Sequence, residues 1–278
     1  MDTKWKFFIN RTAAVAPQWL MIAQKIKRLK SFFYENKPAL IAFSGGVDSS
    51  LLAKIAYDTV GEQAIAITAS GPTFAKLETE NARSIAREIG IQWMELPFDP
   101  MQNPLFNNNS PNRCFYCKKE LYTYLRLFAA KTWDSAILVD GTNAEDDVDE
   151  RPGYKALVEL GISKPLRELG FTKQDITNTC REVGLSNWDK PSQTCTATRI
   201  PYGTRIDISR IKRIERCEAW IKKNGFTQFR LRDIFPEALV ELCPTEFSKK
   251  LTVELRQYIL EMLKSEGYIA ARFEQTDH

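Results

Sequence analysis

A chain of 278 residues, of which 44% are hydrophobic, is long enough to bury one large core or two smaller ones. Its formal net charge of +4 neither requires nor excludes a nucleic-acid partner. No apolar run approaches the roughly 20 residues that a membrane span needs, and the first residues lack the apolar region of a signal peptide. We therefore expect a cytoplasmic globular protein without a membrane segment.

Histidine is nearly absent, whereas cysteine is not. His278 is the only histidine, which argues against a histidine base or a histidine-rich metal site. In a reducing compartment, cysteines are favoured as ligands, nucleophiles or core residues rather than as disulfides. The six cysteines are Cys114, Cys117, Cys180, Cys195, Cys217 and Cys243.

The first two thirds of the chain alternate between two hydrophobic patterns. Apolar residues at helical spacing predict helices, and short apolar runs bounded by turn residues predict buried strands. Helices are predicted over residues 19–33, 50–56, 76–89, 117–130 and 173–183, and strands over 39–43, 64–69, 93–96 and 136–139. This alternation predicts an α/β fold with a doubly wound parallel sheet.

The last third has a different organisation. Residues 184–205 show little apolar periodicity and several Pro, Ser, Thr and Gly, which is typical of a domain boundary. Beyond it, helices are predicted over 207–223 and 245–265, and strands over 227–232, 238–242 and 268–273. We therefore expect a helical extension (1–35), an α/β domain (36–184), a linker carrying Cys195 (185–205) and a smaller C-terminal α+β domain (206–278).

The loop Ser-Gly-Gly-Val-Asp-Ser at residues 44–49 joins the first predicted strand to a helix. Such a turn leaves backbone N–H groups unpaired at the helix N-terminus, and two glycines let a phosphate approach without Cβ interference. The order is neither the Walker nor the dinucleotide-binding pattern. The loop indicates phosphate binding, with an ordinary polar turn as the alternative. Ala69, Ser70 and residues 140–143 follow other predicted strands, and ligands collect at the carboxyl ends of parallel strands.

A C-x-x-C pair, Cys114 and Cys117, precedes Lys118 and Lys119, which favour thiolate over thiol. One such pair leaves a zinc site incomplete, and its position does not match a thioredoxin motif. Cys195, in a polar loop, supplies a third thiol, and three thiolates suit a [4Fe–4S] cluster with one iron open to an exogenous ligand. The alternative is that Cys195 only fills its loop.

The remaining cysteines, Cys180, Cys217 and Cys243, lie in helical or strand-end patterns and are interpreted as structural. Residues 140–155 combine many carboxylates with Arg151 and Lys155. Carboxylates beside a nucleotide could position Mg²⁺, and the two cations could bind phosphate or a carboxylate substrate. A solvated acidic surface loop is the alternative.

Five segments carry a resemblance to one family. They are SGGVDSS (44–50), RCFYCKKELY (113–122), DGTNAEDDVDERPGYKAL (140–157), PLRELGFTKQDI (165–176) and CTATRIPYG (195–203). The first resembles the PP-loop, SGGxDS, of ATP pyrophosphatases, which cleave ATP between the α- and β-phosphates. Together the five resemble the LarE-type ATP-dependent sulfur transferases.

The resemblance implies Mg²⁺, ATP and the substrate pyridinium-3,5-biscarboxylic acid mononucleotide. The carboxylates of that substrate are adenylylated and converted to thiocarboxylates on the route to the nickel-pincer nucleotide cofactor. A cytoplasmic homo-oligomer with other proteins of that biosynthesis as partners is expected. In the domain plan, 36–184 becomes the PP-loop domain and 206–278 the substrate domain.

The resemblance also implies residue roles. Ser44, Gly45, Gly46, Asp48 and Ser49 would bind ATP phosphates, with Asp48 also catalytic, and Gly141, Thr142 and Asn143 would lie beside the nucleotide. Cys114, Cys117 and Cys195 match the three-cysteine branch, in which a [4Fe–4S] cluster carries the sulfur, whereas a lone cysteine matching Cys195 gives up its own sulfur. Arg230 and Arg232 would grip the substrate phosphate, and Arg151, Lys155 and Arg199 are further substrate-binding candidates.

Two other functions stay open. A tRNA thiolation enzyme also combines a PP-loop with three cysteines, but this chain shows neither a zinc module nor a strongly basic domain, and we expect no nucleic-acid partner. A nucleotide-binding redox-sensing module would bind ATP without turnover. One departure from the family is the last segment, residues 268–278, where Arg272 stands in place of an arginine- and glycine-containing stretch.

Overall fold

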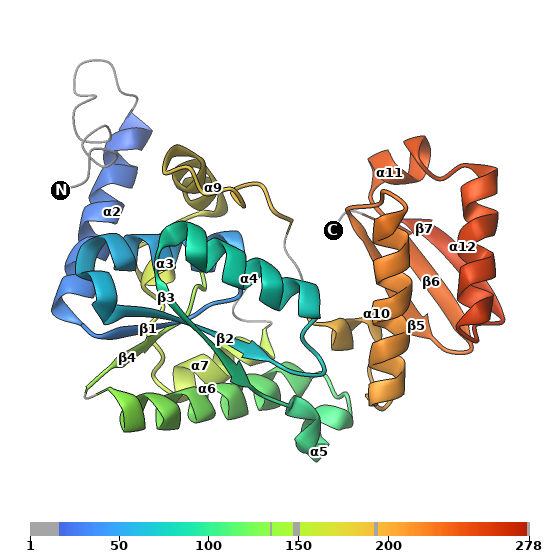
Figure 1. Cartoon of the computed structure of the whole chain (residues 1–278), viewed down its shortest axis with the longest axis horizontal. Helices are drawn as coiled ribbons and strands as arrows, with labels where there is room; N and C mark the ends of the chain where they lie inside the picture. Colours follow the sequence, from blue (N-terminus) through green and yellow to red (C-terminus); the bar gives the residue numbers. More distant parts are fainter. Residues whose placement is uncertain (1–16, 134, 147–150, 192–193, 277–278) are drawn as a thin grey trace. The chain divides into compact units, whose positions relative to one another are not determined.

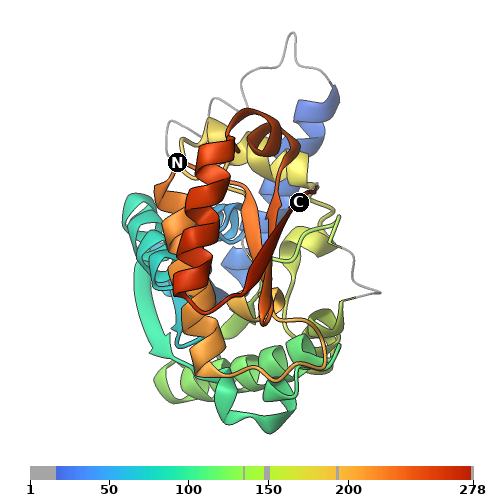
Figure 2. The same ribbon diagram turned by 90° about the vertical axis from the view of Figure 1, so that its right-hand side faces the viewer.

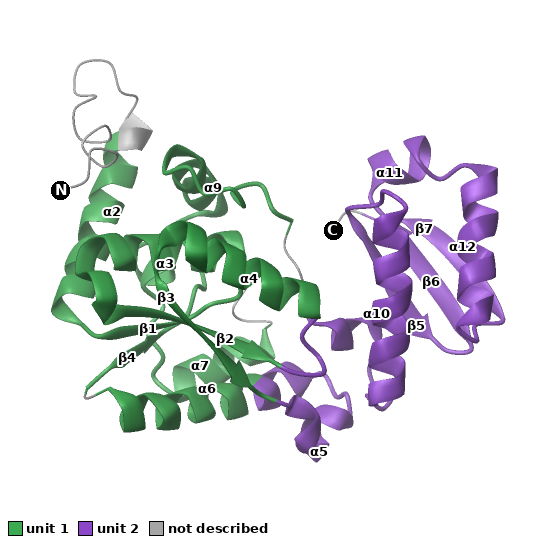
Figure 3. Ribbon diagram, in the orientation of Figure 1, with its two compact units in different colours: residues 1–70, 76–98, 118–192 green, residues 71–75, 99–117, 193–278 purple. Residues whose placement is uncertain are grey.

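The computed structural model describes residues 17–133, 135–146, 151–191 and 194–276 (Figure 1). The chain divides into two compact units, coloured separately in Figure 3. Unit 1 comprises residues 1–70, 76–98 and 118–192, and unit 2 comprises 71–75, 99–117 and 193–278. Unit 2 thus includes two segments that the sequence pattern groups with the α/β domain. No helix in the described ranges is long and apolar enough to cross a membrane.

Unit 1 contains a four-stranded parallel sheet with the order β3-β2-β1-β4. Its strands are β1 (Ala39–Ala42), β2 (Ala64–Ser70), β3 (Gln92–Pro97) and β4 (Ile137–Val139). Its helices are α2 (Pro17–Glu35), α3 (Val47–Val60), η1 (Gly61–Gln63), α4 (Lys76–Ile89), α7 (Pro152–Glu159), α8 (Pro165–Glu168) and α9 (Lys173–Glu182), with most of α6 (Arg113–Thr132).

Strand β2 illustrates why the sheet is covered on both faces. Ala64 and Ala66 belong to a core with α2, α3, α4 and α9, whereas Ile65 and Ile67 belong to a second core with α6 and α7. Alternate residues of a strand point to opposite faces, so a continuous apolar run requires helices on both sides. The predicted doubly wound α/β fold is confirmed, and Figure 1 shows helices on either side of the sheet.

Unit 2 contains a three-stranded mixed sheet of order β5-β6-β7. Strands β5 (Phe229–Ile234) and β6 (Glu237–Leu242) pair antiparallel, and β7 (Ala270–Gln275) pairs parallel to β6. Helices α10 (Ile208–Lys223) and α12 (Val253–Ser265) share one core with the sheet and lie beside it in Figure 2. The unit also contains η2 (Pro100–Gln102), α5 (Pro104–Asn107), η3 (Thr196–Arg199) and α11 (Pro244–Lys249).

The single helix predicted over residues 245–265 is wrong, because two helices occupy this stretch. α11 ends at Lys249, and α12 begins after Thr252, whose hydroxyl accepts a hydrogen bond from the backbone N–H of Leu255 at 3.2 Å. A threonine in this position ends one helix and caps the next. The buried carboxylate of Glu246 in α11 accepts from the backbone N–H of Thr227 at 2.9 Å, which fixes the short helix against the start of β5.

Candidate active site

The loop at residues 44–49 begins where β1 ends, in unit 1. Gly45 has a φ of +68°, and a Cβ there would lie 2.7 Å from the backbone Cα of Ala82 in α4. Gly46 is the N-cap residue of α3, and no side chain caps that helix end. The hydroxyl groups of Ser44 and Ser49 lie 3.2 Å apart beside it. The loop therefore presents small groups and an uncapped helix N-terminus, the environment that an anion prefers.

Asp48, in the first turn of α3, has two partners from elsewhere in unit 1. Its Oδ2 accepts from Nζ of Lys173 at 2.6 Å, and its Oδ1 accepts from the amide of Asn143 at 3.2 Å. Sequence reasoning missed Lys173. It lies 125 residues from Asp48, and a lysine in the first turn of a predicted helix carries no motif signal.

Asn187 is a second missed residue. Its buried amide donates to the carbonyl oxygen of Gly45 at 3.0 Å and to the hydroxyl of Ser50 at 2.9 Å. Its Oδ1 atom is buried without a hydrogen-bond partner in the described part of the chain. Asn187 lies in the stretch interpreted as a linker, where nothing in the local pattern marks an asparagine as part of the loop.

The turn that follows β4 lies against the same loop. Gly141, directly after β4, approaches so closely that a Cβ there would lie 3.2 Å from the backbone nitrogen of Ser49. Asn143 is fully buried, and Ala69 and Ser70 close β2 and are half-buried. The structure therefore brings Ser44, Ser49 and the 140–143 turn together at one edge of the unit 1 sheet.

The acidic-basic segment is only partly described, since residues 147–150 lie outside the described ranges. Arg151 is exposed and pairs with Asp146 at 2.8 Å. Lys155 is exposed on α7. Arg167, which sequence reasoning missed, donates to the carbonyl oxygens of Asn143 at 3.2 Å and Asp146 at 3.0 Å, and so holds the turn after β4 in place.

Cys114 and Cys117 lie in the first turn of α6, in a segment that belongs to unit 2. Just before them, the buried amide of Asn109 donates to the carbonyl oxygens of Pro201 and Thr204, at 2.8 Å each. Its Oδ1 accepts from Nη1 of Arg113 at 2.5 Å. Asn109 therefore ties the start of the cysteine helix to the segment that follows Cys195.

A shared hydrophobic cluster reinforces this connection. Cys117 packs against a cluster that includes Phe106, Ala197 and Ile200, so the C-x-x-C helix and the Cys195 loop meet within unit 2. Cys195 keeps an exposed surface, and its thiol donates to the carbonyl oxygen of Thr73 at 3.6 Å.

The pKa of the Cys195 thiol is raised, first because protein atoms surround the sulfur and further because two negative charges on the neighbouring sulfurs of Cys195 and Cys114 would repel each other. The guanidinium groups of Arg113 and Arg199 oppose this shift. The hydroxyl of Thr73 is buried and has no partner among the described residues. In the described ranges no three His, Cys, Asp or Glu side chains lie close enough to hold a metal ion.

Three arginines of unit 2 influence one another electrostatically: Arg199 in the Cys195 loop, and Arg230 and Arg232 on β5. Arg199, 4% exposed, donates from Nε to Glu218 at 2.7 Å, and Arg232 donates to Glu241 and to the carbonyl oxygen of Thr198, both at 2.9 Å. Burial and the positive charges of Arg199 and Arg232 lower the pKa of Arg230. Among the described residues Arg230 makes no ion pair, so an anion here would relieve the repulsion between like charges.

The cysteines interpreted as structural are all buried. Burial and the charge of Asp48 raise the pKa of Cys180, and burial raises the pKa of Cys217 to about 12. Cys243 is buried as the N-cap residue of α11. Lys118 and Lys119, expected to favour thiolates, both pair with carboxylates, Asp140 and Glu159 respectively.

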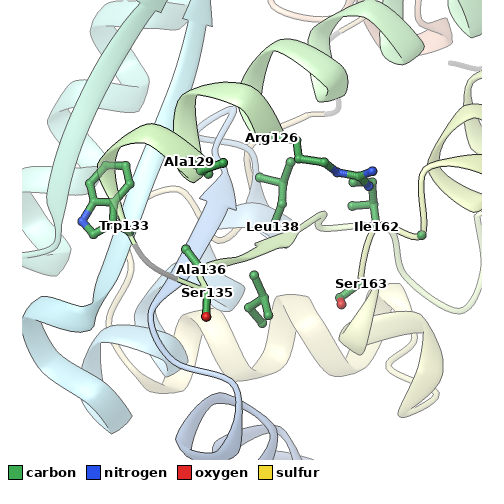
Figure 4. Close-up of a pocket in the computed structure, with 11 residues that line it drawn as sticks. Arg126, Ala129, Trp133, Ser135, Ala136, Leu138, Ile162 and Ser163 are labelled. Carbon is green, nitrogen blue, oxygen red and sulfur yellow. The ribbon is translucent and has the colours of Figure 1, made fainter.

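One cavity of about 300 Å³ lies in unit 1 away from these residues. Arg126, Trp133, Leu138 and Ile162 are among its lining residues, as Figure 4 shows. None of the residues predicted for the site lines it.

Comparison with known proteins supports a nucleotide enzyme. A family model described as NAD synthase matches residues 21–144. An uncharacterized protein of Synechocystis is 39% identical over 82% of this chain and 85% of its own length. The pyridinium-3,5-bisthiocarboxylic acid mononucleotide synthase of Lactiplantibacillus plantarum is 33% identical over 80% of each chain. One polypeptide of the glutamine-hydrolysing GMP synthase of Halobacterium salinarum is 26% identical over 54% of this chain and 52% of its own length.

The parallel sheet, with its Ser-Gly-Gly-Val-Asp-Ser loop at the end of β1, defines an enzyme of the PP-loop ATP pyrophosphatase superfamily. Within that superfamily, the similarity to the Lactiplantibacillus plantarum synthase spans four fifths of both chains. The chain belongs to the LarE-type family of ATP-dependent sulfurtransferases, and the predicted family is confirmed.

Proposed function

We propose that the protein uses Mg-ATP to activate a carboxylate of pyridinium-3,5-biscarboxylic acid mononucleotide and converts it to a thiocarboxylate for nickel-pincer nucleotide synthesis in the cytoplasm. A substrate carboxylate oxygen attacks the α-phosphorus, and pyrophosphate leaves with the electron pair of the broken P–O bond. Hydrosulfide then attacks the acyl carbon, and AMP leaves. The name of the Lactiplantibacillus relative, a pyridinium-3,5-bisthiocarboxylic acid mononucleotide synthase, and its similarity over four fifths of both chains support this substrate.

The residues of unit 1 suit the adenylylation step. The uncapped N-terminus of α3, with Gly45 and Gly46, would receive the departing pyrophosphate. Asp48 offers carboxylate oxygens of the kind that Mg²⁺ takes. Its partner Lys173, now 2.6 Å away, would then be free to neutralise a phosphate oxygen. Positioning and charge neutralisation are sufficient here, because an acyl adenylate needs no histidine base.

The residues of unit 2 suit substrate binding. Arg230, crowded by Arg199 and Arg232, would bind the substrate phosphate, since guanidinium groups pair with phosphate through two parallel hydrogen bonds. Arg151 and Lys155, exposed cations of unit 1, remain candidates for the substrate carboxylates.

Cys114, Cys117 and Cys195 fit an iron–sulfur cluster by their donor chemistry. Thiolates are its usual ligands, and the buried hydroxyl of Thr73, next to the carbonyl that Cys195 contacts, is a donor without a partner in the described residues. A [4Fe–4S] cluster on these three residues would supply the sulfide for transfer. The protein's own part is to hold three thiolates, and metal binding commonly gathers its ligands as it occurs.

One observation carries the proposal. The backbone of the Cys195 loop accepts a hydrogen bond from Arg232 at Thr198, and Arg199 follows Cys195 by four residues. The Cys195 loop and two of the arginines that we propose to bind the substrate are therefore held together within unit 2, which supports transfer of sulfur to an anionic substrate.

The test is an anaerobic assay with ATP, sulfide and the synthetic substrate, in which the product is identified by mass and AMP and pyrophosphate are quantified. We expect a thiocarboxylate product and pyrophosphate release that depends on the substrate. In Arg230→Ala, KM for the substrate should rise about tenfold or more, since a hydrogen bond to a charged group contributes about 1.5–3 kcal/mol.

Arg216→Ala is the matched control, because Arg216 is 58% exposed on α10 and pairs with Glu266 rather than with any residue proposed for the site. It should leave KM unchanged. Pyrophosphate release without the carboxylated substrate, or thiolation of bulk tRNA instead of the mononucleotide, would overturn the proposal.

A further inference from the structure

Asp140, directly after β4, is a buried carboxylate that the proposed reaction does not use. Its Oδ1 accepts two hydrogen bonds from Thr142, one from the backbone N–H at 2.8 Å and one from the hydroxyl. Its Oδ2 accepts from the hydroxyl of Tyr122 and from Nζ of Lys118 at 3.4 Å. Oδ1 therefore accepts hydrogen bonds from the turn beside the nucleotide loop, and Oδ2 accepts hydrogen bonds from helix α6.

The Asp140 carboxylate stays ionised inside the protein. Burial by itself would raise the pKa of Asp140, but the ammonium of Lys118 and the hydrogen bonds from Thr142 and Tyr122 outweigh burial and lower it. Burial and the charge of Asp140 raise the pKa of Tyr122, so its hydroxyl keeps its proton and donates. With Asp140 8% exposed and Tyr122 3% exposed, solvent screens this arrangement poorly.

Helix α6 extends the connection along the chain. Arg113–Thr132 is one continuous helix, with Cys114 and Cys117 in its first turn and Lys118 immediately after them. Tyr122 follows one turn later, and a helix transmits a displacement along its axis because its backbone hydrogen bonds are continuous. At the other end of the connection, Gly141 lies against the backbone of Ser49.

We propose that Asp140 is a positioning residue that couples the turn beside the nucleotide loop to the helix carrying Cys114 and Cys117, so that nucleotide binding changes the reactivity of this thiol pair. A nucleotide that moves Thr142 acts on Oδ1, and the rigid carboxylate passes the movement to Tyr122 and Lys118 through Oδ2. The inference rests on the proposed function, since it takes the 140–143 turn to lie beside bound ATP.

The test measures thiol reactivity rather than product. The apoprotein is treated with iodoacetamide with and without an ATP analogue that has a methylene group between its α- and β-phosphates, and alkylation of Cys114 and Cys117 is followed by peptide mass spectrometry. In the wild type the analogue should change the alkylation rate by about fivefold, at the lower end of usual couplings. In Asp140→Asn and in Tyr122→Phe, the effect of the analogue on the alkylation rate should fall below about twofold. The double variant should lose no more of this effect than either single variant, because the two residues act in one connection.

Glu159→Gln is the matched control, because Glu159 pairs with Lys119 on the same helix at 2.8 Å but is exposed. It should respond to the analogue as the wild type does. Calorimetry on each variant reports analogue binding separately. A wild type that binds the analogue without a thiol response, or variants that keep the full response, would overturn the inference alone, whereas failure of the wild type to bind would overturn the proposed function with it.

Discussion

Gly45 meets two requirements at once, and both concern its missing side chain. Its φ of +68° lies in the left-handed region, which costs an alanine about 1–2 kcal/mol. In addition, the Cα of Ala82 would lie 2.7 Å from a new Cβ, and a backbone atom cannot move aside as a flexible side chain can. The glycine thus lets α4 pack against the loop that would hold the ATP phosphates.

We expect Gly45→Ala to lower the free energy of unfolding by more than these 1–2 kcal/mol and to weaken ATP binding, because the loop must shift to relieve the contact with Ala82. Urea unfolding and calorimetry with ATP measure both effects. Gly170→Ala separates the two causes, since Gly170 has a φ of +70° and a Cβ there would have no atom within 4 Å. Equal losses in the two variants would mean that the approach of Ala82 contributes nothing.

At the scale of elements, Asn109 joins the segment before α6 to the segment after Cys195. Besides its side-chain bonds to the carbonyls of Pro201 and Thr204, its backbone carbonyl accepts from the N–H of Gly203 at 3.0 Å. Its φ of +51° is one that asparagine tolerates better than most residues. A single residue therefore supplies both the turn conformation and the connection.

We expect Asn109→Ala to cost about 1–3 kcal/mol for buried groups left without partners, and about 1–2 kcal/mol more for the left-handed backbone. Asn109→Gly should show only the first cost. Urea unfolding gives the free energies, and hydrogen exchange at the amide of Gly203 reports whether the segment is released. An alanine variant as stable as the glycine variant would show that the backbone conformation costs nothing here.

The sequence predicts what depends on local pattern. β1, β2 and α4 appear with nearly the predicted bounds, because apolar periodicity and Gly or Pro boundaries are local signals. Asn187 and Asn109 carry no such signal, because each donates hydrogen bonds to carbonyl oxygens far away in the sequence. Asn187 bonds to Gly45, 142 residues away, and Asn109 bonds to Pro201, 92 residues away. Such contacts exist only after folding, and a polar residue in an irregular segment carries no periodic signal.

The candidate site divides in the same way. The 44–49 loop and the strand ends could be placed from the sequence, because topology alone gathers the carboxyl ends of parallel strands. The ion-pair partners of Asp48 and Lys118 could not be predicted from the sequence. Asp48 pairs with Lys173 and Lys118 pairs with Asp140, because ion pairs form between surfaces that only the fold brings together.

For the whole molecule, the two units divide the proposed reaction between them. The residues that suit ATP cleavage belong to unit 1, and Cys114, Cys117, Cys195 and the paired arginines belong to unit 2. Helix α6 contributes residues to both units: its first turn belongs to unit 2, and the remainder of the helix belongs to unit 1. Loss of the sulfur carrier should therefore leave ATP activation intact.

The double variant Cys114→Ser/Cys117→Ser tests this division. After anaerobic treatment with iron and sulfide, the wild type should bind iron and form more than one thiocarboxylate per chain. The double variant should bind none, still release pyrophosphate with substrate, and form at most one product per chain. In it the Cys195 sulfur would attack the acyl carbon, and cleavage of its Cβ–S bond with loss of the α-proton would leave dehydroalanine, which intact-protein mass reveals as loss of hydrogen sulfide. Cys243→Ser, at a buried helix cap, should behave as the wild type. A double variant that retains iron and repeated turnover would contradict the assignment of these thiols.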